Sequence, residues 1–536
     1  MPIQLLDRLE AWKTRFGSRD TVPLERLLAA AATWRSRDAA SLIRLHETVL
    51  FLRAWPPTPE AARLADAILF SFARRIAELL EDELSAFAEP EVSGIAGTSL
   101  SAVFSYEVAR SLADRHPRNV EVAWDCYDNP DRLGPLLARL LPLIGEEWPV
   151  EAHVPYREWI SAARGRGTTD LAWLLARTQV ESFDALQVPL TWEIADARIS
   201  RSRLRLPKRS LFCHTEPLLR RNDVSLAGEL ESPPLVVKRV PRGQARKILD
   251  LILDTSAVRY RELYGFSHPD EARVFHADAG RGVDIYFFGV PPQWRLPLRA
   301  YHAGMFFKNG VPAGYIELLS LFERAETGFN LYYTFREGET AWLYVRLLRL
   351  FHQVLGVSCF SVDPYQIGLE NPEAVDSGAF WFYRKLGFRP VDPAVATLTA
   401  REERRMRQTP GYRSSKRTLE KLAADCVVFE ARSAEKGAWD RFRIRGVALG
   451  ASLGFDDQAR STASQRIARM LGIESSSGLA LVMSRIPDLE SWTQEEKAAA
   501  AGILRAKESA SEARYLRLMQ RHRRLRAALL ALGSAG

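Results

Sequence analysis

The stretch FWFYRKLGF, residues 380–388, decides how the second half of this chain is expected to fold. We predict one helix over 372–386 that carries Tyr383 and stops at Gly387, because glycine accepts the left-handed conformation that closes many helices. A strand is predicted to follow over 388–391. Taken alone, the stretch also fits an aromatic-rich amphipathic helix with a purely structural role.

A second segment, REGETA at 336–341, lies about forty residues before that stretch. It separates a strand predicted over 329–335 from a helix predicted over 341–355. A helix start offers free N–H groups and the positive end of the helix dipole, which suits a pyrophosphate. The alternative is a plain strand-to-helix turn whose glutamates favour the helix dipole.

The helix at 372–386 resembles the last helix of the GCN5-related N-acetyltransferase (GNAT) superfamily. That helix often reads Asn-x-x-Ala-x-x-x-Tyr-x-x-x-Gly-Phe, and its Tyr commonly reaches the thiol of coenzyme A. The positions that match are Ala379, Tyr383, Gly387 and Phe388, while Asp376 replaces the Asn.

The segment at 336–341 resembles the pyrophosphate turn of the same superfamily, Arg/Gln-x-x-Gly-x-Gly/Ala. Arg336 and Ala341 match its two ends; Glu339 takes the place of the middle glycine, and Gly338 lies one residue earlier. The resemblance implies an acyl-CoA donor, such as acetyl-CoA, held by Phe335, Arg336, Gly338, Glu339, Thr340, Ala341, Asp376 and Ala379.

Acyl transfer from such a donor needs a neutral amine, a stabilised oxyanion and a hydrogen bond to the leaving thiolate. The resemblance gives the last role to Tyr383, whose phenol can donate without a shifted pKa. Glu317 interrupts an apolar run and is the candidate base; the alternative is a solvent-facing side chain. Asp363 and Glu370 are reserves, and orientation of the amine could replace a dedicated base.

The predicted order of elements resembles the GNAT fold over about 233–431. The expected fold class is therefore α/β (α+β): a mixed-sheet core with a helical domain at 1–200, a connector at 201–232 and a helical tail at 432–536. The Asn309-Gly310 pair predicts a tight hairpin. Predicted strands cover 235–240, 284–290, 300–307, 313–322, 329–335, 357–362, 388–391 and 426–430, and predicted helices cover 245–264, 341–355 and 372–386.

Composition is that of a globular protein, with 47% apolar and 26% charged residues in a chain of 536. No apolar run approaches the ~18 residues of a membrane helix, and the first residues lack the basic region of a signal peptide. The four cysteines are scattered, and the nine histidines have no metal-ligand spacing. We therefore expect a cytoplasmic protein with reduced thiols, no membrane insertion and no metal.

Positive charge is concentrated toward the C-terminus, where residues 401–536 hold 26 basic and 16 acidic residues. This region could meet nucleic acid or another acidic partner, or could simply be solvated helices. Residues 401–421 alone hold eight basic and three acidic residues, including Arg404, Arg405 and Arg407. This positive charge predicts an amine acceptor that is anionic. The alternative is that the stretch is only a solvated helix or a disordered loop.

Two functions remain open from the sequence. The first is an acyl-CoA-dependent N-acyltransferase that works by direct attack of the amine in a ternary complex. The alternative is a catalytically weak or inactive GNAT-like protein that binds or regulates partners through its helical flanks.

Overall fold

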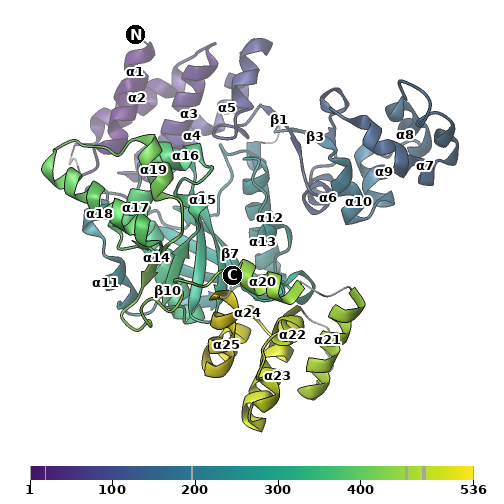
Figure 1. Ribbon diagram of the computed structural model, residues 1–536. Coiled ribbons are helices and arrows are strands. Elements are labelled where there is room, and N and C mark those ends of the chain that lie inside the picture. Colours follow the sequence, from purple (N-terminus) through teal and green to yellow (C-terminus); the bar gives the residue numbers. More distant parts are fainter. Residues whose placement is uncertain (1, 18–19, 195–196, 453–456, 474–477, 535–536) are drawn as a thin grey trace.

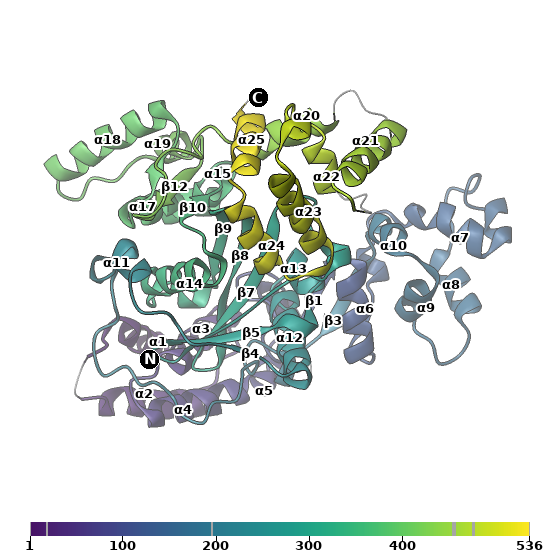
Figure 2. The same cartoon turned by 90° about the horizontal axis from the view of Figure 1, so that it is seen from below.

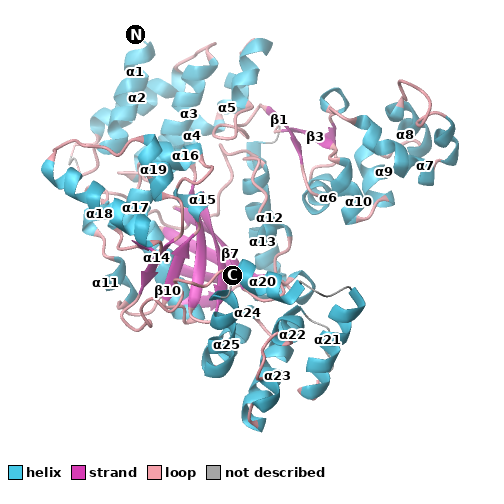
Figure 3. Ribbon diagram, in the orientation of Figure 1, coloured by secondary structure: helices cyan, strands magenta, loops and turns pink. Residues whose placement is uncertain are grey.

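A computed structural model of the chain describes residues 2–17, 20–194, 197–452, 457–473 and 478–534. Within these ranges the fold is mixed α/β, with a large mixed sheet, a small antiparallel sheet and many helices around them (Figure 3). The mixed α/β class predicted from the sequence is confirmed in this coarse form.

The large sheet forms the centre of the molecule. Within the described ranges its strand order is β11-β12-β10-β9-β8-β7-β6-β5-β4. Neighbours are antiparallel except β9 and β10, which run parallel. The strands are β4 (Val237–Arg239), β5 (Phe275–Gly280), β6 (Val283–Gly289), β7 (Ala300–Lys308), β8 (Val311–Leu321), β9 (Arg324–Leu331), β10 (Cys359–Val362), β11 (Arg389–Pro390) and β12 (Val427–Glu430).

The hairpin between β7 and β8 confirms the prediction made from Asn309-Gly310. Asn309 has a φ of 49° and Gly310 a φ of 80°, the positive values that a two-residue hairpin turn requires. The Asn309 amide also donates to the Ala54 carbonyl oxygen at 2.8 Å. The turn therefore connects the sheet to the N-terminal helices as well as joining two strands.

Replacing Gly310 with alanine is expected to lower the thermal unfolding midpoint. Its φ is positive, and a Cβ would lie 2.3 Å from the Leu206 carbonyl oxygen; strained backbone positions of this kind cost about 1–3 kcal/mol each. Differential scanning fluorimetry measures the shift. The matched control is Gly502→Ala, in a helix with open space around the new methyl group, where helix propensity predicts a gain of about 1 kcal/mol. Equal midpoints for both variants would contradict this account of the turn.

Two sets of helices cover the two faces of the sheet. On one face lies α14 (Thr340–Leu355), where Tyr344 packs against Phe329 and Phe351 packs against Phe287. On the other face Phe266 packs against Phe288. That face carries α12 (Arg242–Ala257) and α13 (Tyr264–Ser267); the remaining helices of this part are α11 (Leu226–Leu230), α15 (Pro364–Ile367), α16 (Pro372–Ser377), α17 (Ala379–Lys385), α18 (Pro393–Gln408) and α19 (Lys416–Leu422).

The first helices of the chain share one hydrophobic core with the large sheet, and Figure 1 shows them (purple) directly beside it. Phe51 stacks on Trp55, which in turn contacts Phe335 just after β9. The helices are α1 (Pro2–Glu10), α2 (Val22–Thr33), α3 (Ala39–Ala54), α4 (Pro59–Phe70) and α5 (Phe72–Ile76).

Residues from about 100 to 204 build a second core, set apart from the sheet in Figure 1. Besides the predicted helices it contains three strands among its described residues, which the sequence analysis did not predict. These strands are short and pair over long distances, which leaves little local signal. They are β1 (Ser99–Val103), β2 (Val120–Val122) and β3 (Pro189–Glu193), with helices α6 (Tyr106–Arg115), α7 (Gly134–Leu140), α8 (Tyr156–Arg164), α9 (Asp170–Arg177) and α10 (Val180–Leu186).

The last part of the chain is helical, as predicted, and has its own core against one end of the sheet (Figure 2). Its helices are α20 (Ile444–Ser452), α21 (Asp457–Met470), α22 (Gly478–Met483), α23 (Gln494–Ser509), α24 (Glu512–Arg521) and α25 (Arg523–Ser534). None of the helices described in the structure combines the length and the apolar character that crossing a membrane would require.

Two predicted elements near the motifs differ from the structure. The strand expected over 329–335 is β9, which starts at Arg324 and ends at Leu331, followed by a 3₁₀ turn. The tight turn before β9 has Phe322 at a φ of 51°, without the glycine or asparagine that would have signalled it. The helix expected over 372–386 is split into α16 and α17, because Gly378 adopts a φ of 66° between them.

Candidate functional site

The parallel strands β9 and β10 separate at the centre of the sheet. They pair only from Arg324 to Glu326 on β9, and β9 then continues to Leu331 alone on this side. Strand β10 stops because Asp363-Pro364 begins α15: Asp363 accepts a hydrogen bond from the Tyr365 N–H at 2.9 Å, and proline cannot donate to a ladder. The separation leaves one edge of β9 open.

A pocket of about 240 Å³ lies at this open edge; we call it the tyrosine pocket. Strand β9 forms one side and helices α16 and α17 the other. Its lining residues are Phe329, Asn330, Leu331, Arg336, Thr340, Gln366, Asn371, Glu373, Ala374, Ser377, Ala379, Phe382 and Tyr383.

Tyr383 is held rigidly in this pocket. Its ring packs edge-on against Tyr344 and Phe388, and only 4% of the residue is exposed. Burial raises the pKa of its phenol well above the usual range, so the O–H remains protonated at neutral pH. Within the described residues the hydroxyl has no hydrogen-bond partner, which leaves it available to a bound molecule.

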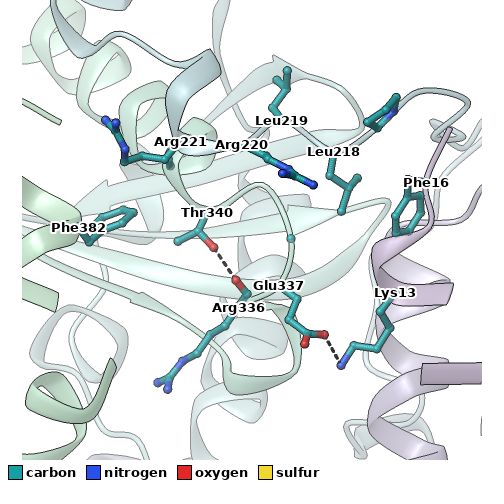
Figure 4. Close-up of a pocket in the computed structure, with 13 residues that line it drawn as sticks. Lys13, Phe16, Leu218, Leu219, Arg220, Arg221, Arg336, Glu337, Thr340 and Phe382 are labelled. Atoms are coloured by element: carbon teal, nitrogen blue, oxygen red, sulfur yellow. Dashed lines mark hydrogen bonds and ion pairs between the residues drawn. The ribbon is translucent and has the colours of Figure 1, made fainter. Parts of the chain in front are cut away.

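A second pocket, of about 360 Å³, adjoins the first at Arg336, Thr340 and Phe382; we call it the turn pocket. Figure 4 shows that four parts of the chain meet there: Lys13 and Phe16, the segment 217–221, the segment 336–341, and Phe382. The start of α14 lies in its wall, and within the described residues the backbone N–H groups of Thr340 and Ala341 have no acceptor. The lining residues are Lys13, Phe16, Pro217, Leu218, Leu219, Arg220, Arg221, Arg336, Glu337, Gly338, Thr340, Ala341 and Phe382.

Most of the charged residues that line the turn pocket are cations. Arg220 and Arg221 come from the loop at 217–221, and Lys13 from the N-terminal helices. The acid that lines it, Glu337, is paired with Lys13 at 2.6 Å. Arg336 forms an ion pair with Glu373 at the border with the tyrosine pocket. Free N–H groups at a helix start together with surplus arginine charge suit an anionic ligand.

Of the residues that the resemblance assigns to the donor, Glu339 and Phe335 line neither pocket, while Gly338 lines the turn pocket but is also constrained by packing. Glu339 is turned into the interior, 1% exposed, and pairs with Arg281 at 2.5 Å. A Cβ on Gly338 would lie 2.8 Å from the Trp55 ring, so packing alone requires glycine there. Phe335 is fully buried against Trp55 and does not line either pocket.

A third, larger hollow of about 870 Å³ continues from the turn pocket along α17 to the α18–α19 connection; we call it the basic groove. Arg220, Arg221, Lys385 and Arg413 line it. Asp376 lines it too and is paired with Lys416 at 2.5 Å, so it does not reach the tyrosine pocket.

Most arginines of the basic insertion (401–421) lie outside the basic groove, Arg413 being the exception. Arg404, Arg405 and Arg407 are exposed on α18 and do not line the groove. The insertion is mostly helical, since α18 and α19 cover most of it. The turn between these helices is held by the buried Glu402, which accepts hydrogen bonds at 2.8 Å from Tyr412 and Ser414. The positive charge of the groove therefore comes from Arg413 and from residues outside this stretch.

Glu317 and Tyr383 are not brought together. Successive strand residues point to opposite faces, and Glu317 lies opposite Gly328, one position from the Phe329 that packs under α14. Its carboxylate faces the α12–α13 side and accepts a hydrogen bond from the Tyr301 hydroxyl. Burial raises its pKa, and the bond from Tyr301 offsets part of that rise.

The reserve carboxylates also have positions of their own. Asp363 caps α15, as described above, and Glu370 lies in the following loop with a φ of 54°. Neither lines the tyrosine pocket.

Sequence reasoning missed several residues of the site. Asn330, Gln366, Asn371 and Glu373 line the tyrosine pocket, and Arg220 and Arg221 line the turn pocket. The polar pair Gln366 and Asn371 follows directly after a buried strand, which is a usable signal for a site. The arginines lie more than a hundred positions before the turn, and no local pattern connects them to it.

Comparison of the chain with protein-family models, with curated proteins and with solved structures finds no match.

Proposed function

We propose that this protein is an N-acyltransferase that takes its acyl group from an acyl-CoA. The observation that carries the proposal is the separation of β9 and β10 over a pocket that contains the buried Tyr383, whose protonated hydroxyl has no hydrogen-bond partner among the described residues. The adjoining turn pocket, with free N–H groups and arginines, supports it further.

The residues present fit such a donor. The N–H groups of Thr340 and Ala341, with Arg220 and Arg221, would hold a pyrophosphate. The open edge of β9 offers backbone polar groups to a pantetheine-like arm, and the tyrosine pocket would enclose the thioester. The donor supplies an activated carbonyl carbon and a thiolate leaving group.

In the proposed transfer the neutral amine attacks the carbonyl carbon, a C–N bond forms and the C–S bond breaks. The Tyr383 O–H donates a hydrogen bond to the sulfur that leaves, and the proton lost by the amine passes to water. Holding the amine against the thioester lowers the barrier without a dedicated base. Glu317 does not line this pocket, so the step does not use it.

The acceptor is proposed to be an amine that carries negative charge. Lys385 and Arg413, which line the basic groove but not the turn pocket, would attract it. Such attraction weakens with salt because the Debye length is about 8 Å at physiological ionic strength.

Isothermal titration with acetyl-CoA, followed by chromatography of the thioester over time with a panel of amines, tests the proposal. Saturable binding and amine-dependent loss of the thioester are expected. Saturable binding without thioester loss for any amine would favour the alternative, a regulatory protein that only binds the donor. The absence of binding at millimolar acetyl-CoA would overturn both.

A further inference from the structure

Segment 336–341 resembles a pyrophosphate turn, and Glu339 stands where that turn has its middle glycine. The contacts of the Glu339 carboxylate give it a different role. One carboxylate oxygen accepts from the Arg281 Nη2 at 2.5 Å and from the Leu219 backbone N–H at 3.1 Å. The other accepts from the Arg281 Nε at 3.2 Å and lies 4.0 Å from the Lys308 Nζ. The carboxylate therefore accepts three hydrogen bonds from donors on two different segments.

The Leu219 contact matters because Leu219 belongs to the 217–221 loop. That loop is anchored upstream, where the His214 N–H donates to the Pro56 carbonyl oxygen at 2.8 Å, and downstream, where Arg221 donates to the Lys385 carbonyl oxygen. The bond from Leu219 to Glu339 attaches the middle of the loop to the turn, one residue before Arg220. Figure 4 shows Leu219 and Arg220 across the turn pocket from Glu337 and Thr340.

The two cations around Glu339 contact the sheet and α14, and both also lie over the ring of Phe212, in the segment that leads into the loop. Lys308 is fully buried at the end of β7, and its ammonium donates to the Arg281 carbonyl oxygen. It also lies over the Trp55 ring, 5.3 Å from the centroid. The Arg281 guanidinium lies over the Trp342 ring at 5.9 Å. Arg281 is thus held beside α14, and Glu339 connects it to the loop by its hydrogen bonds to Arg281 and Leu219. Lys308 lies farther from the carboxylate and makes no hydrogen bond to it.

We propose that Glu339 is a positioning residue that fixes the 217–221 loop, so that Arg220 and Arg221 already line the turn pocket before any ligand arrives. The expected effect on donor affinity rests on the proposed function. The expected effect on the order of the loop is independent of that function. Pre-ordering a binding loop raises affinity because less conformational entropy is lost on binding.

The test uses Glu339→Gln, which keeps the size of the side chain but places an NH₂ where an acceptor is needed. Hydrogen–deuterium exchange of the peptide containing Leu219, in the full chain without ligand, is expected to speed up by tenfold or more. The Kd for coenzyme A is expected to rise by about tenfold, while turnover at saturating donor changes less than threefold.

The matched control is Lys308→Met, which perturbs the same buried cluster but keeps the contacts of Glu339 with Arg281 and Leu219. Exchange and the Kd for coenzyme A are expected to stay within twofold of the unmodified chain. Should Glu339→Gln fail to fold by circular dichroism, Glu339→Asp is the second variant, since its shorter side chain keeps the charge but cannot reach both donors.

Adding Glu339→Gln to a chain that already lacks both arginines separates loss of loop positioning from a nonspecific loss of binding. With Arg220 and Arg221 both changed to Ala, adding Glu339→Gln should weaken coenzyme A binding less than twofold further, because the residues it positions are gone. Unchanged exchange at Leu219 in Glu339→Gln would overturn the inference, as would an undiminished tenfold loss in the double background. A chain that binds no coenzyme A but shows the faster exchange would overturn only the proposed function and leave the loop fixing intact.

Discussion

Changing Tyr383 to Phe is expected to reduce turnover of the acyl donor by about 10²-fold or more, the range for a positioned acid. The variant removes one hydroxyl from a ring that Tyr344 and Phe388 hold in place, so the pocket keeps its shape. Donor affinity should change much less, because the hydrogen bond to sulfur strengthens as the thiolate develops. Steady-state kinetics and titration with acetyl-CoA measure the two effects separately.

The matched control is Tyr344→Phe. Tyr344 is also buried and carries a hydroxyl, but that hydroxyl pairs with Thr327 at 3.0 Å and does not line the tyrosine pocket. Losing this hydrogen bond should cost about 1 kcal/mol of stability and change turnover less than threefold. Equal losses of turnover in the two variants, or equal losses of affinity and turnover in Tyr383→Phe, would mean that Tyr383 has a packing role only.

Changing Thr340 to Glu is expected to weaken donor binding by about 100-fold or more, since like charges brought together cost several kcal/mol. Thr340 is the first residue of α14 and lines both the turn pocket and the tyrosine pocket. A glutamate there favours the helix dipole, so folding should be unaffected or slightly improved. The substitution is therefore expected to repel the donor's pyrophosphate without destabilising the fold. Titration with coenzyme A measures the loss of affinity.

Thr340→Gln is the control for size, because it adds the same bulk without charge. It should weaken binding by a much smaller factor, and the difference between the two variants should shrink as salt is raised. Identical affinities for Thr340→Glu and the unmodified chain would show that the pyrophosphate does not bind at the start of α14.

Elements with a strong local signal could be predicted from the sequence. The β7–β8 hairpin follows from Asn309-Gly310, and the helix predicted over 341–355 is α14, which ends before Gly356 at a φ of 70°. Where the local signal was absent or misleading, the prediction failed. Phe322 turns the chain at a positive φ without a turn residue, and Gly378 breaks a helix in a stretch that otherwise looks continuous.

The candidate site was only partly predictable for a related reason. Tyr383 and the turn at 336–341 could be found because each carries a compact pattern. Arg220 and Arg221 lie next to the turn only because of tertiary packing, so no local pattern predicts them. For Glu339 the local pattern was present but misleading. Its position in the pattern suggests a residue facing the ligand, yet its side chain turns inward because Arg281 and Lys308 offer a buried carboxylate two cations.

A crystal structure of the chain with coenzyme A tests the central claim most directly. The account predicts density for the pyrophosphate at the N–H groups of Thr340 and Ala341, beside Arg220 and Arg221. It also predicts the arm along the open edge of β9 and the sulfur within hydrogen-bond distance of the Tyr383 hydroxyl. Coenzyme A bound elsewhere, with the tyrosine pocket and the turn pocket holding only water, would contradict it.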